Sequence, residues 1–253
     1  MQAMRALIAA LLLFALAAFA AAPARAADAP QVLIAYRDKA PYSYTENGQP
    51  VGQLNDKTRA IFQRAGLDLR FEEMPSKRIA LELRNNNVPL CSPGWYRLPE
   101  REVFAGFSKP IQRDRPQVVL ASVSSAPKVR AHAGLQALLN DKALLLTVID
   151  EISYGPEIDA MIRRAPRPPL RATATSEQLA RMVAAERADY MLVDQDDLDH
   201  LKKEGETRGL VDIHFADTPA GLYRHLWCSK KVDRAMMERI NGAIGQLGYD
   251  SPR

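Results

Sequence analysis

The sequence predicts an α/β protein made of two small lobes, each containing a sheet flanked by helices. Short apolar segments alternate with segments of helical periodicity along most of the chain. The length of 253 residues is large for one doubly wound sheet and sufficient for two smaller ones. No internal repeat is visible, which makes a solenoid unlikely on the pattern alone.

The composition narrows the class of protein further. Charged side chains make up 25% of the chain and hydrophobic ones 47%, which suits a globular protein and excludes a disordered tail. The 4 histidines are scattered, and neither a zinc-protease motif nor a nucleophile elbow is present. We therefore expect no catalytic site, no metal and no cofactor.

The first 26 residues have the three parts of a secretory signal peptide. Arg5 supplies the positive charge, residues 6–22 are uncharged, and Ala24-Arg25-Ala26 fits the rule for cleavage between small residues. The alternative is a transmembrane anchor, for which this alanine-rich run is short. Cleavage would place the protein in the periplasm. Loss of two arginines would lower the formal charge from +4 to +2, too small a surplus to predict nucleic-acid binding.

The two cysteines, Cys91 and Cys228, can pair in an oxidising compartment. A disulfide that closes so long a loop stabilises the fold by roughly 4 kcal/mol in the chain-entropy model. The alternative is two buried free cysteines, and the sequence alone does not give the Cα separation that decides between them.

A first series of elements precedes Pro110. Gly66 ends its first helix, and Ser76 is a suitable N-cap for its second. Strands that alternate with helices predict a parallel sheet. The predicted elements are strands at 32–36, 69–73 and 88–91 and helices at 55–65 and 76–84.

A second series follows, with the same alternation. Pro156 fits the first turn of a helix, and Ser176 is a candidate cap for the next helix. The predicted strands are 118–123, 144–149, 170–174, 190–193, 211–215 and 222–228, and the predicted helices are 135–139, 156–161, 176–183, 198–203 and 232–247.

Four short segments stand out by their order and spacing along the chain: Ala40-Pro41-Tyr42 with Gly52, Pro99-Glu100-Arg101 with Phe107-Ser108, Ser153-Tyr154-Gly155, and Ala188 to Asp194. Taken in this order, they resemble the type 2 periplasmic solute-binding proteins, specifically the family 3 group that serves polar amino-acid uptake. The resemblance covers nearly all of the mature chain. It implies two Rossmann-like lobes with a central ligand cleft: lobe 1 from residues 28–112 and 221–253, and lobe 2 from residues 113–220.

The resemblance also implies a function. A protein of this kind captures a small polar, carboxylate-bearing solute and delivers it to a membrane ABC transporter or receptor, and we expect a monomer. The alternatives are a periplasmic enzyme of the dehydratase type on the same fold and a sensory ligand-binding protein.

Two charged residues match the family's ligand contacts. Arg101 matches an arginine that holds a ligand carboxylate, which a planar guanidinium can bind with two parallel hydrogen bonds. The alternative is a surface arginine paired with Glu100 or Glu102. Asp194 matches an acidic residue that meets a ligand ammonium, and the alternative is the solvated start of a helix at residues 194–197.

Five further residues are candidates for ligand binding. Ser153 and Tyr154 precede a helix, where N–H groups and a hydroxyl can receive an anion, although Ser153 can equally cap that helix. Tyr42 and Trp95 can cover the apolar part of a ligand or simply pack in the core. Arg78 adds positive charge near the strand ends of lobe 1.

The chain also departs from the amino-acid-binding pattern. Tyr36 and Lys39 stand where many relatives have an acidic residue after the first strand and an aromatic residue before Ala-Pro. Tyr96-Arg97-Leu98 replaces a segment that usually contains threonine. These changes remove expected ammonium contacts, so we expect a small carboxylate rather than an ordinary α-amino acid.

Overall fold

The computed structural model describes residues 31–150 and 152–251. The predicted signal peptide at residues 1–26 lies outside the described residues. In the described part the chain forms two five-stranded sheets with helices on both faces of each, together with one short hairpin. The hairpin strands, β2 and β3, fall in the turn-rich segment that follows the first strand: β2 (Tyr44–Glu46) and β3 (Gln49–Val51).

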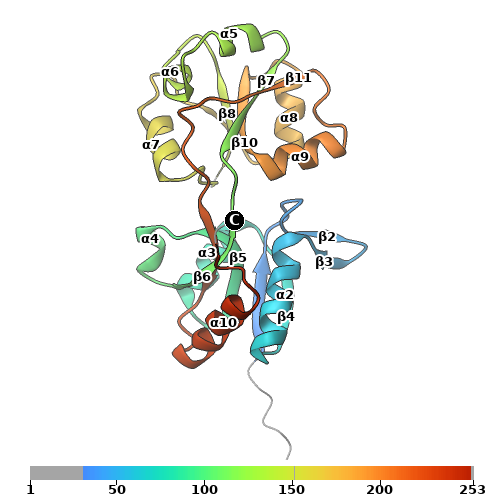
Figure 1. Cartoon of the computed structure of the whole chain (residues 1–253), viewed down its shortest axis with the longest axis vertical. Coiled ribbons are helices and arrows are strands. Elements are labelled where there is room, and N and C mark those ends of the chain that lie inside the picture. Colours follow the sequence, from blue (N-terminus) through green and yellow to red (C-terminus); the bar gives the residue numbers. More distant parts are fainter. Residues whose placement is uncertain (1–30, 151, 252–253) are drawn as a thin grey trace, which may run out of the picture. The chain divides into compact units, whose positions relative to one another are not determined.

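The first sheet has the strand order β4-β1-β5-β12-β6 (Figure 1). β1 is parallel to β4 and β5, whereas β12 is antiparallel to both β5 and β6. The prediction of a parallel sheet is therefore wrong at β12. The chain leaves this sheet at the end of β6 and returns to it along β12, which runs in the opposite direction to β5 and β6. The strands are β1 (Val32–Tyr36), β4 (Leu69–Glu73), β5 (Leu90–Tyr96), β6 (Gly106–Arg113) and β12 (Tyr223–Cys228).

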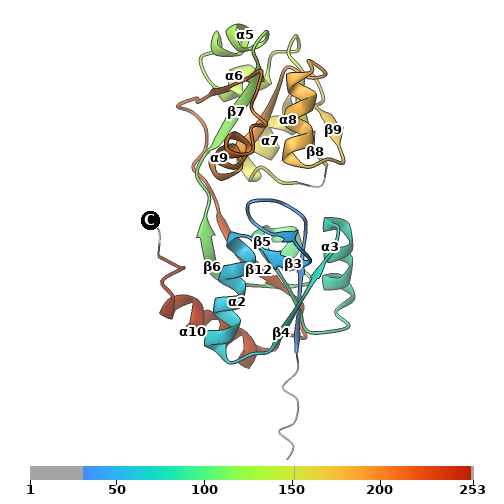
Figure 2. The same ribbon diagram turned by 90° about the vertical axis from the view of Figure 1, so that its right-hand side faces the viewer.

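Alternate residues of β1 point to opposite faces of this sheet, as the pleat requires. Ile34 belongs to the core beneath α2 and α10, and Leu33 to the core beneath α3. Figure 2 shows α3 on one side of the sheet and α2 with α10 on the other. The helices are α2 (Gln53–Ala65), α3 (Ser76–Asn85), α4 (Pro99–Glu102) and α10 (Arg234–Gln246).

The second sheet has the order β11-β7-β10-β8-β9. β8 is parallel to β9 and β10, and β7 is antiparallel to β10 and β11. Its strands are β7 (Gln117–Ser122), β8 (Leu146–Ile149), β9 (Leu170–Ala172), β10 (Tyr190–Asp194) and β11 (Leu210–Ile213). Its helices are α5 (Ala126–Arg130), α6 (Leu135–Leu139), α7 (Pro156–Arg164), α8 (Ser176–Ala184) and α9 (Gln195–Lys203).

We call the first sheet with its helices lobe 1 and the second sheet with its helices lobe 2. Two segments connect them, one between β6 and β7 and one between β11 and β12. The backbone N–H of Asp114 in the first segment donates to the carbonyl of Leu222 in the second, at 2.9 Å. This bond holds the two connections together where they pass between the sheets.

The helix starts of lobe 2 agree only in part with the sequence. Pro156 occupies the first turn of α7, as predicted. The cap of α8 is Thr175 rather than Ser176: its hydroxyl accepts from the Gln178 N–H, and the Gln178 side chain accepts from the Thr175 N–H. This capping box satisfies two helix-end donors at once, which a serine one residue later would not do.

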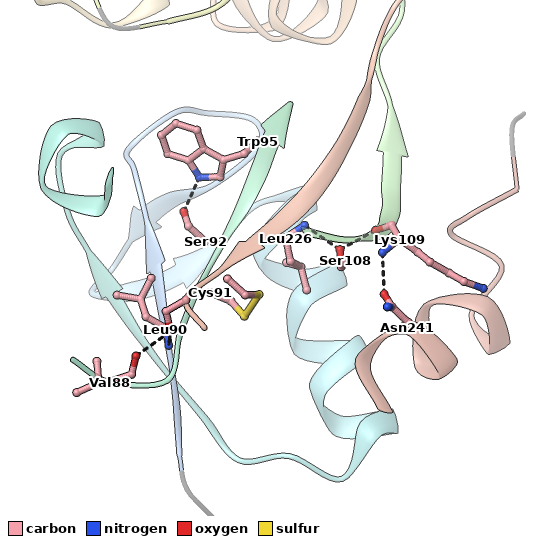
Figure 3. Close-up of a disulfide and its surroundings, with 11 residues drawn as sticks. Val88, Leu90, Cys91, Ser92, Trp95, Ser108, Lys109, Leu226 and Asn241 are labelled. Atoms are coloured by element: carbon pink, nitrogen blue, oxygen red, sulfur yellow. Dashed lines mark hydrogen bonds between the residues drawn. A yellow bond between two sulfur atoms is a disulfide. The ribbon is translucent and has the colours of Figure 1, made fainter. Parts of the chain in front are cut away.

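The structure contains a disulfide between Cys91 on β5 and Cys228 on β12 (Figure 3). The two residues are register partners on adjacent strands, and their Cα atoms are 4.0 Å apart. Both are fully buried in the core of lobe 1. The bridge therefore links β12, near the end of the chain, to β5, 137 residues earlier in the sequence.

Candidate functional site

A small cavity of about 40 Å³ lies between loops and strand ends of the two lobes. It adjoins a larger space of about 620 Å³, with which it shares the lining residues Arg37, Lys39, Ile149, Ile152 and Ser176. Both lobes line the small cavity. Lobe 1 contributes Arg37, Lys39, Gly94, Trp95, Tyr96, Arg101 and, from β12, Arg224; lobe 2 contributes Gln117, Ile149, Ile152, Ser153, Tyr154, Ser176, Leu192, Val193, Asp194 and Asp197.

Asp194 lies at the end of β10 and also caps α9, accepting from the Asp197 N–H at 2.9 Å. The Tyr42 hydroxyl donates to its Oδ1 at 2.5 Å. The Lys39 ammonium is 3.5 Å from Asp194 Oδ2 and 3.0 Å from Asp197 Oδ2. These contacts join the loop after β1 to the start of α9, so the carboxylate of Asp194 is already engaged by the chain itself.

Arg224 forms a second buried contact to this carboxylate. Its Nε is 2.6 Å from Asp114 Oδ1, its Nη2 is 3.4 Å from Asp194 Oδ2, and its Nη1 donates to the Gly94 carbonyl at 3.1 Å. The guanidinium lies 4.3 Å from the ring of Tyr42. The two carboxylates raise the pKa of Arg224 against the opposing effect of burial.

The two acids at this site differ in their ionisation. Burial raises the pKa of Asp197 to about 7, and the neighbouring Asp194 charge adds to the rise. Its Oδ1 is buried without a hydrogen-bond partner in the described part of the chain. Burial also acts on Asp194, but Lys39 and Arg224 outweigh it, so the net effect is a lowered pKa. Asp194 is therefore the more readily ionised member of the pair.

Arg37 and Arg101 line the cavity beside Trp95. The guanidinium carbons lie 5.3 Å (Arg37) and 4.8 Å (Arg101) from the Trp95 ring. Arg101 donates to the Tyr96 carbonyl at 2.9 Å. Within residues 31–150 and 152–251, neither guanidinium has a carboxylate oxygen within 4.0 Å.

The surroundings of the two arginines disfavour their charge. Burial, together with the positive charges of Arg224 and Arg101, lowers the pKa of Arg37 to about 10. Burial also lowers the pKa of Arg101. Glu102, the expected surface partner of Arg101, instead pairs with Arg97 at 2.6 Å. Two cations that face a cavity without a close counter-ion are suited to binding an anion.

The turn before α7 is held by its own hydrogen bonds. The Ser153 hydroxyl donates to Asp159 Oδ2 at 2.5 Å, and the Tyr154 N–H donates to Asp159 Oδ1 at 2.9 Å. The cap position of α7 is Gly155, whose N–H donates to Ser153 Oγ at 3.2 Å, so Ser153 supports the turn from two residues before the cap rather than occupying the cap position. Tyr154 Oη accepts from the Ile149 N–H at 3.1 Å, which leaves its own proton for a further acceptor.

The structure brings five of the predicted ligand residues to the cavity and leaves two outside it. Tyr42 lies behind Asp194 in the lobe 1 core rather than on the cavity wall. The Arg78 side chain is 60% exposed on the outer face of α3 and lies 3.8 Å from Glu82. The five that line the cavity are Trp95, Arg101, Ser153, Tyr154 and Asp194.

Two arginines of the cavity, Arg37 and Arg224, had no place in the sequence-based site. Arg37 directly follows β1, whose residues are all buried. Its position at the carboxyl end of a buried strand, where ligands bind in α/β folds, was a signal that could have pointed to it. Arg224 lies inside the strand Tyr-Arg-His-Leu-Trp-Cys, and a charged residue in a buried strand is rare unless it is paired.

The sequence profile of the bacterial extracellular solute-binding proteins, family 3, matches residues 32–251. The chain belongs to this family. In the described residues no helix is long and apolar enough to cross a membrane, and no group of three or more potential metal ligands occurs there. No curated protein sequence matches the chain significantly.

Solved structures of the same fold include binding proteins and sensor domains. The BvgS VFT2 domain of Bordetella pertussis has a TM-score of 0.69 and 19% identity, covering 88% of this chain and 91% of that one. The arginine-, lysine-, histidine-binding protein ArtJ of Geobacillus stearothermophilus has a TM-score of 0.68 and 20% identity, covering 87% and 91%. A structure from a study of glutathione import through GshT in Streptococcus mutans has a TM-score of 0.68 and 13% identity, covering 87% and 90%.

Proposed function

We propose that this family 3 protein is a periplasmic solute-binding protein that captures a small polar solute bearing a carboxylate and delivers it to a membrane ABC transporter. The observation that carries the proposal is the pair Arg37 and Arg101 beside Trp95, two cations without a carboxylate in ion-pair range among the described residues. Similar proteins are named for arginine, lysine, histidine and glutathione, all of which bear carboxylates.

Each lobe has a part in binding. A carboxylate between Arg101 and Arg37 receives charge-assisted hydrogen bonds, which are stronger than neutral ones. The Trp95 ring, fixed by its N–H donating to Ser92 Oγ at 2.7 Å (Figure 3), offers an apolar surface to the carbon part of the ligand. Tyr154 from lobe 2 offers its hydroxyl. A ligand that contacts both lobes favours the arrangement in which they meet.

The test is calorimetric titration of the exported protein with a library of amino acids, dicarboxylates, keto acids and sugar acids. We expect at least one carboxylate to bind, and Arg101→Gln to lose about 2 to 5 kcal/mol of its affinity, the range for removing one member of a buried charge pair. Arg234→Gln is the control, because Arg234 has a side chain 93% exposed on α10. Binding of no carboxylate, or equal affinity in Arg101→Gln, contradicts the proposal.

The transporter step needs a separate experiment. Uptake of the radiolabelled ligand is compared in cells with the protein, without it, and with Arg101→Gln. Loss of uptake in both altered strains is expected. Tight binding in vitro with unchanged uptake in the deletion strain would favour a sensory role over transport.

A further inference from the structure

The acidic end of the cavity already holds an ammonium group of the chain. Lys39 Nζ is within 3.5 Å of Asp194 and within 3.0 Å of Asp197, and its side chain is only 14% exposed. The Tyr42 hydroxyl and Arg224 complete the contacts of Asp194. A ligand ammonium brought to this carboxylate would have to displace Lys39 or lie beside a buried cation of the same sign.

The charges around the cavity do not cancel. Lys39 lies against the carboxylates of Asp194 and Asp197, and Arg224 lies against those of Asp114 and Asp194, so two cations meet three carboxylates in that cluster. Burial raises the pKa of Asp197, which disfavours the third negative charge. Arg37 and Arg101 are then two further positive charges.

Other acids attract the two arginines only from beyond 4.0 Å, and one of them, Asp197, acts on Arg37. Glu100 and Asp159 attract Arg101 from beyond 4.0 Å, and Asp159 already accepts from Ser153 and Tyr154. The surplus positive charge therefore faces the cavity, where Trp95 and Ile152 provide apolar surface for a carbon skeleton.

Building on the proposed function, we propose that the ligand is a compact organic dianion of the dicarboxylate class without an ammonium group. One carboxylate binds Arg101 and the other binds Arg37, with the carbon chain against Trp95. Lys39 acts as a selectivity residue, because it occupies the position that an amino group on the ligand would need.

The experiment compares ligands that differ only in the amino group. Succinate is paired with aspartate and glutarate with glutamate, and butyrate and sulfate test the need for a second carboxylate and for a carbon skeleton. By calorimetry on the native protein, we expect each dicarboxylate to bind at least about 10-fold more tightly than its aminated partner and than butyrate, and sulfate to bind more weakly than succinate.

Variants then assign the effect to residues. Arg37→Gln and Arg101→Gln are each expected to weaken succinate binding by at least about 30-fold, whereas Arg234→Gln leaves it unchanged. Lys39→Met uncovers Asp194, so the preference for succinate over aspartate falls by at least about 10-fold. Lys39→Arg keeps a cation there and keeps the preference, which separates charge from packing. If Lys39→Met does not fold, the ligand pairs on the native protein still decide.

The outcomes separate this inference from the proposed function. Aspartate or glutamate binding as tightly as its unaminated partner overturns the inference and leaves the carboxylate-binding function intact. Tight binding of monocarboxylates with no gain from a second carboxylate does the same. Failure of every carboxylate, including a case where sulfate alone binds, overturns both.

Discussion

Replacing Arg224 with Met removes the cation that holds two buried carboxylates. Its side chain is 3% exposed, and Asp114 beside it is 1% exposed. After the change Asp194 keeps Lys39 and Tyr42, whereas Asp114 keeps only the hydroxyl of Tyr96 at 2.5 Å. Breaking a buried pair by removing one partner costs about 3 to 5 kcal/mol, and the cost here falls mainly on Asp114.

The measurement is urea-induced unfolding followed by tryptophan fluorescence and circular dichroism. Arg113→Met is the matched control on the neighbouring strand, because Arg113 is exposed and its bond to the Gly221 carbonyl is long at 3.4 Å; we expect a change within about 0.5 kcal/mol. The double variant Arg224→Met, Asp114→Asn should recover at least about 1 kcal/mol relative to the sum of the single changes. A loss below about 1 kcal/mol in Arg224→Met, or strict additivity in the double variant, would refute the assigned role of the pair.

Three further results are expected. Replacing Cys91 and Cys228 with Ala should lower the unfolding free energy by about 4 to 5 kcal/mol in the chain-entropy model, since the bridge spans a sequence separation of 137. A loss under about 1 kcal/mol by urea unfolding would contradict this. The pKa of Asp197 is raised to about 7 in the folded protein against about 3.9 in the unfolded chain, so the contribution of Asp197 to stability declines as pH rises from about 4 to 7. Asp197→Asn removes this titration and keeps all 4 histidines, so the difference in unfolding free energy between pH 5 and pH 8 should differ between the variant and the native protein. An identical difference in both proteins would count against the raised pKa. Arg78→Gln should leave ligand affinity unchanged in calorimetry, because Arg78 lies on the outer face of α3; a loss of 10-fold or more would return it to the site.

Much of the fold was accessible from periodicity and local signals. The strand 32–36 and the helix ended by Gly66 are present because an apolar run and an αL stop are local properties of the chain. β6 was missed, because Pro110 inside it is a signal against a strand and only its place at the sheet edge makes it tolerable. The direction of β12 was missed because pairing between residues 137 apart is set by tertiary topology.

The site was accessible mainly through resemblance. The match to family segments points to Arg101 and Asp194, whereas Trp95 is a candidate only as an aromatic residue that can cover a ligand, and the structure gathers all three at one cavity. Arg78 is a candidate because its helix begins near the strand ends of lobe 1. That position along the chain does not determine which face of the helix carries the side chain, and the structure places it on the exposed face. For Arg37 the sequence marks the end of a buried strand but does not show that the side chain faces a cavity rather than solvent.

The contacts that join the lobes bear on how ligand affinity is divided. Lys39, Tyr42 and Arg224 contact Asp194 and Asp197 across the lobes, so part of the free energy that stabilises the joined arrangement comes from the chain rather than from the ligand. The apparent affinity of any ligand depends on the fraction of molecules in the binding-competent state. Weakening these contacts should therefore lower the affinity for aminated and unaminated ligands together, whereas the loss of selectivity at Lys39 appears only in their ratio. Measuring both ligands of a pair on one variant separates the population of the competent state from recognition of the ligand.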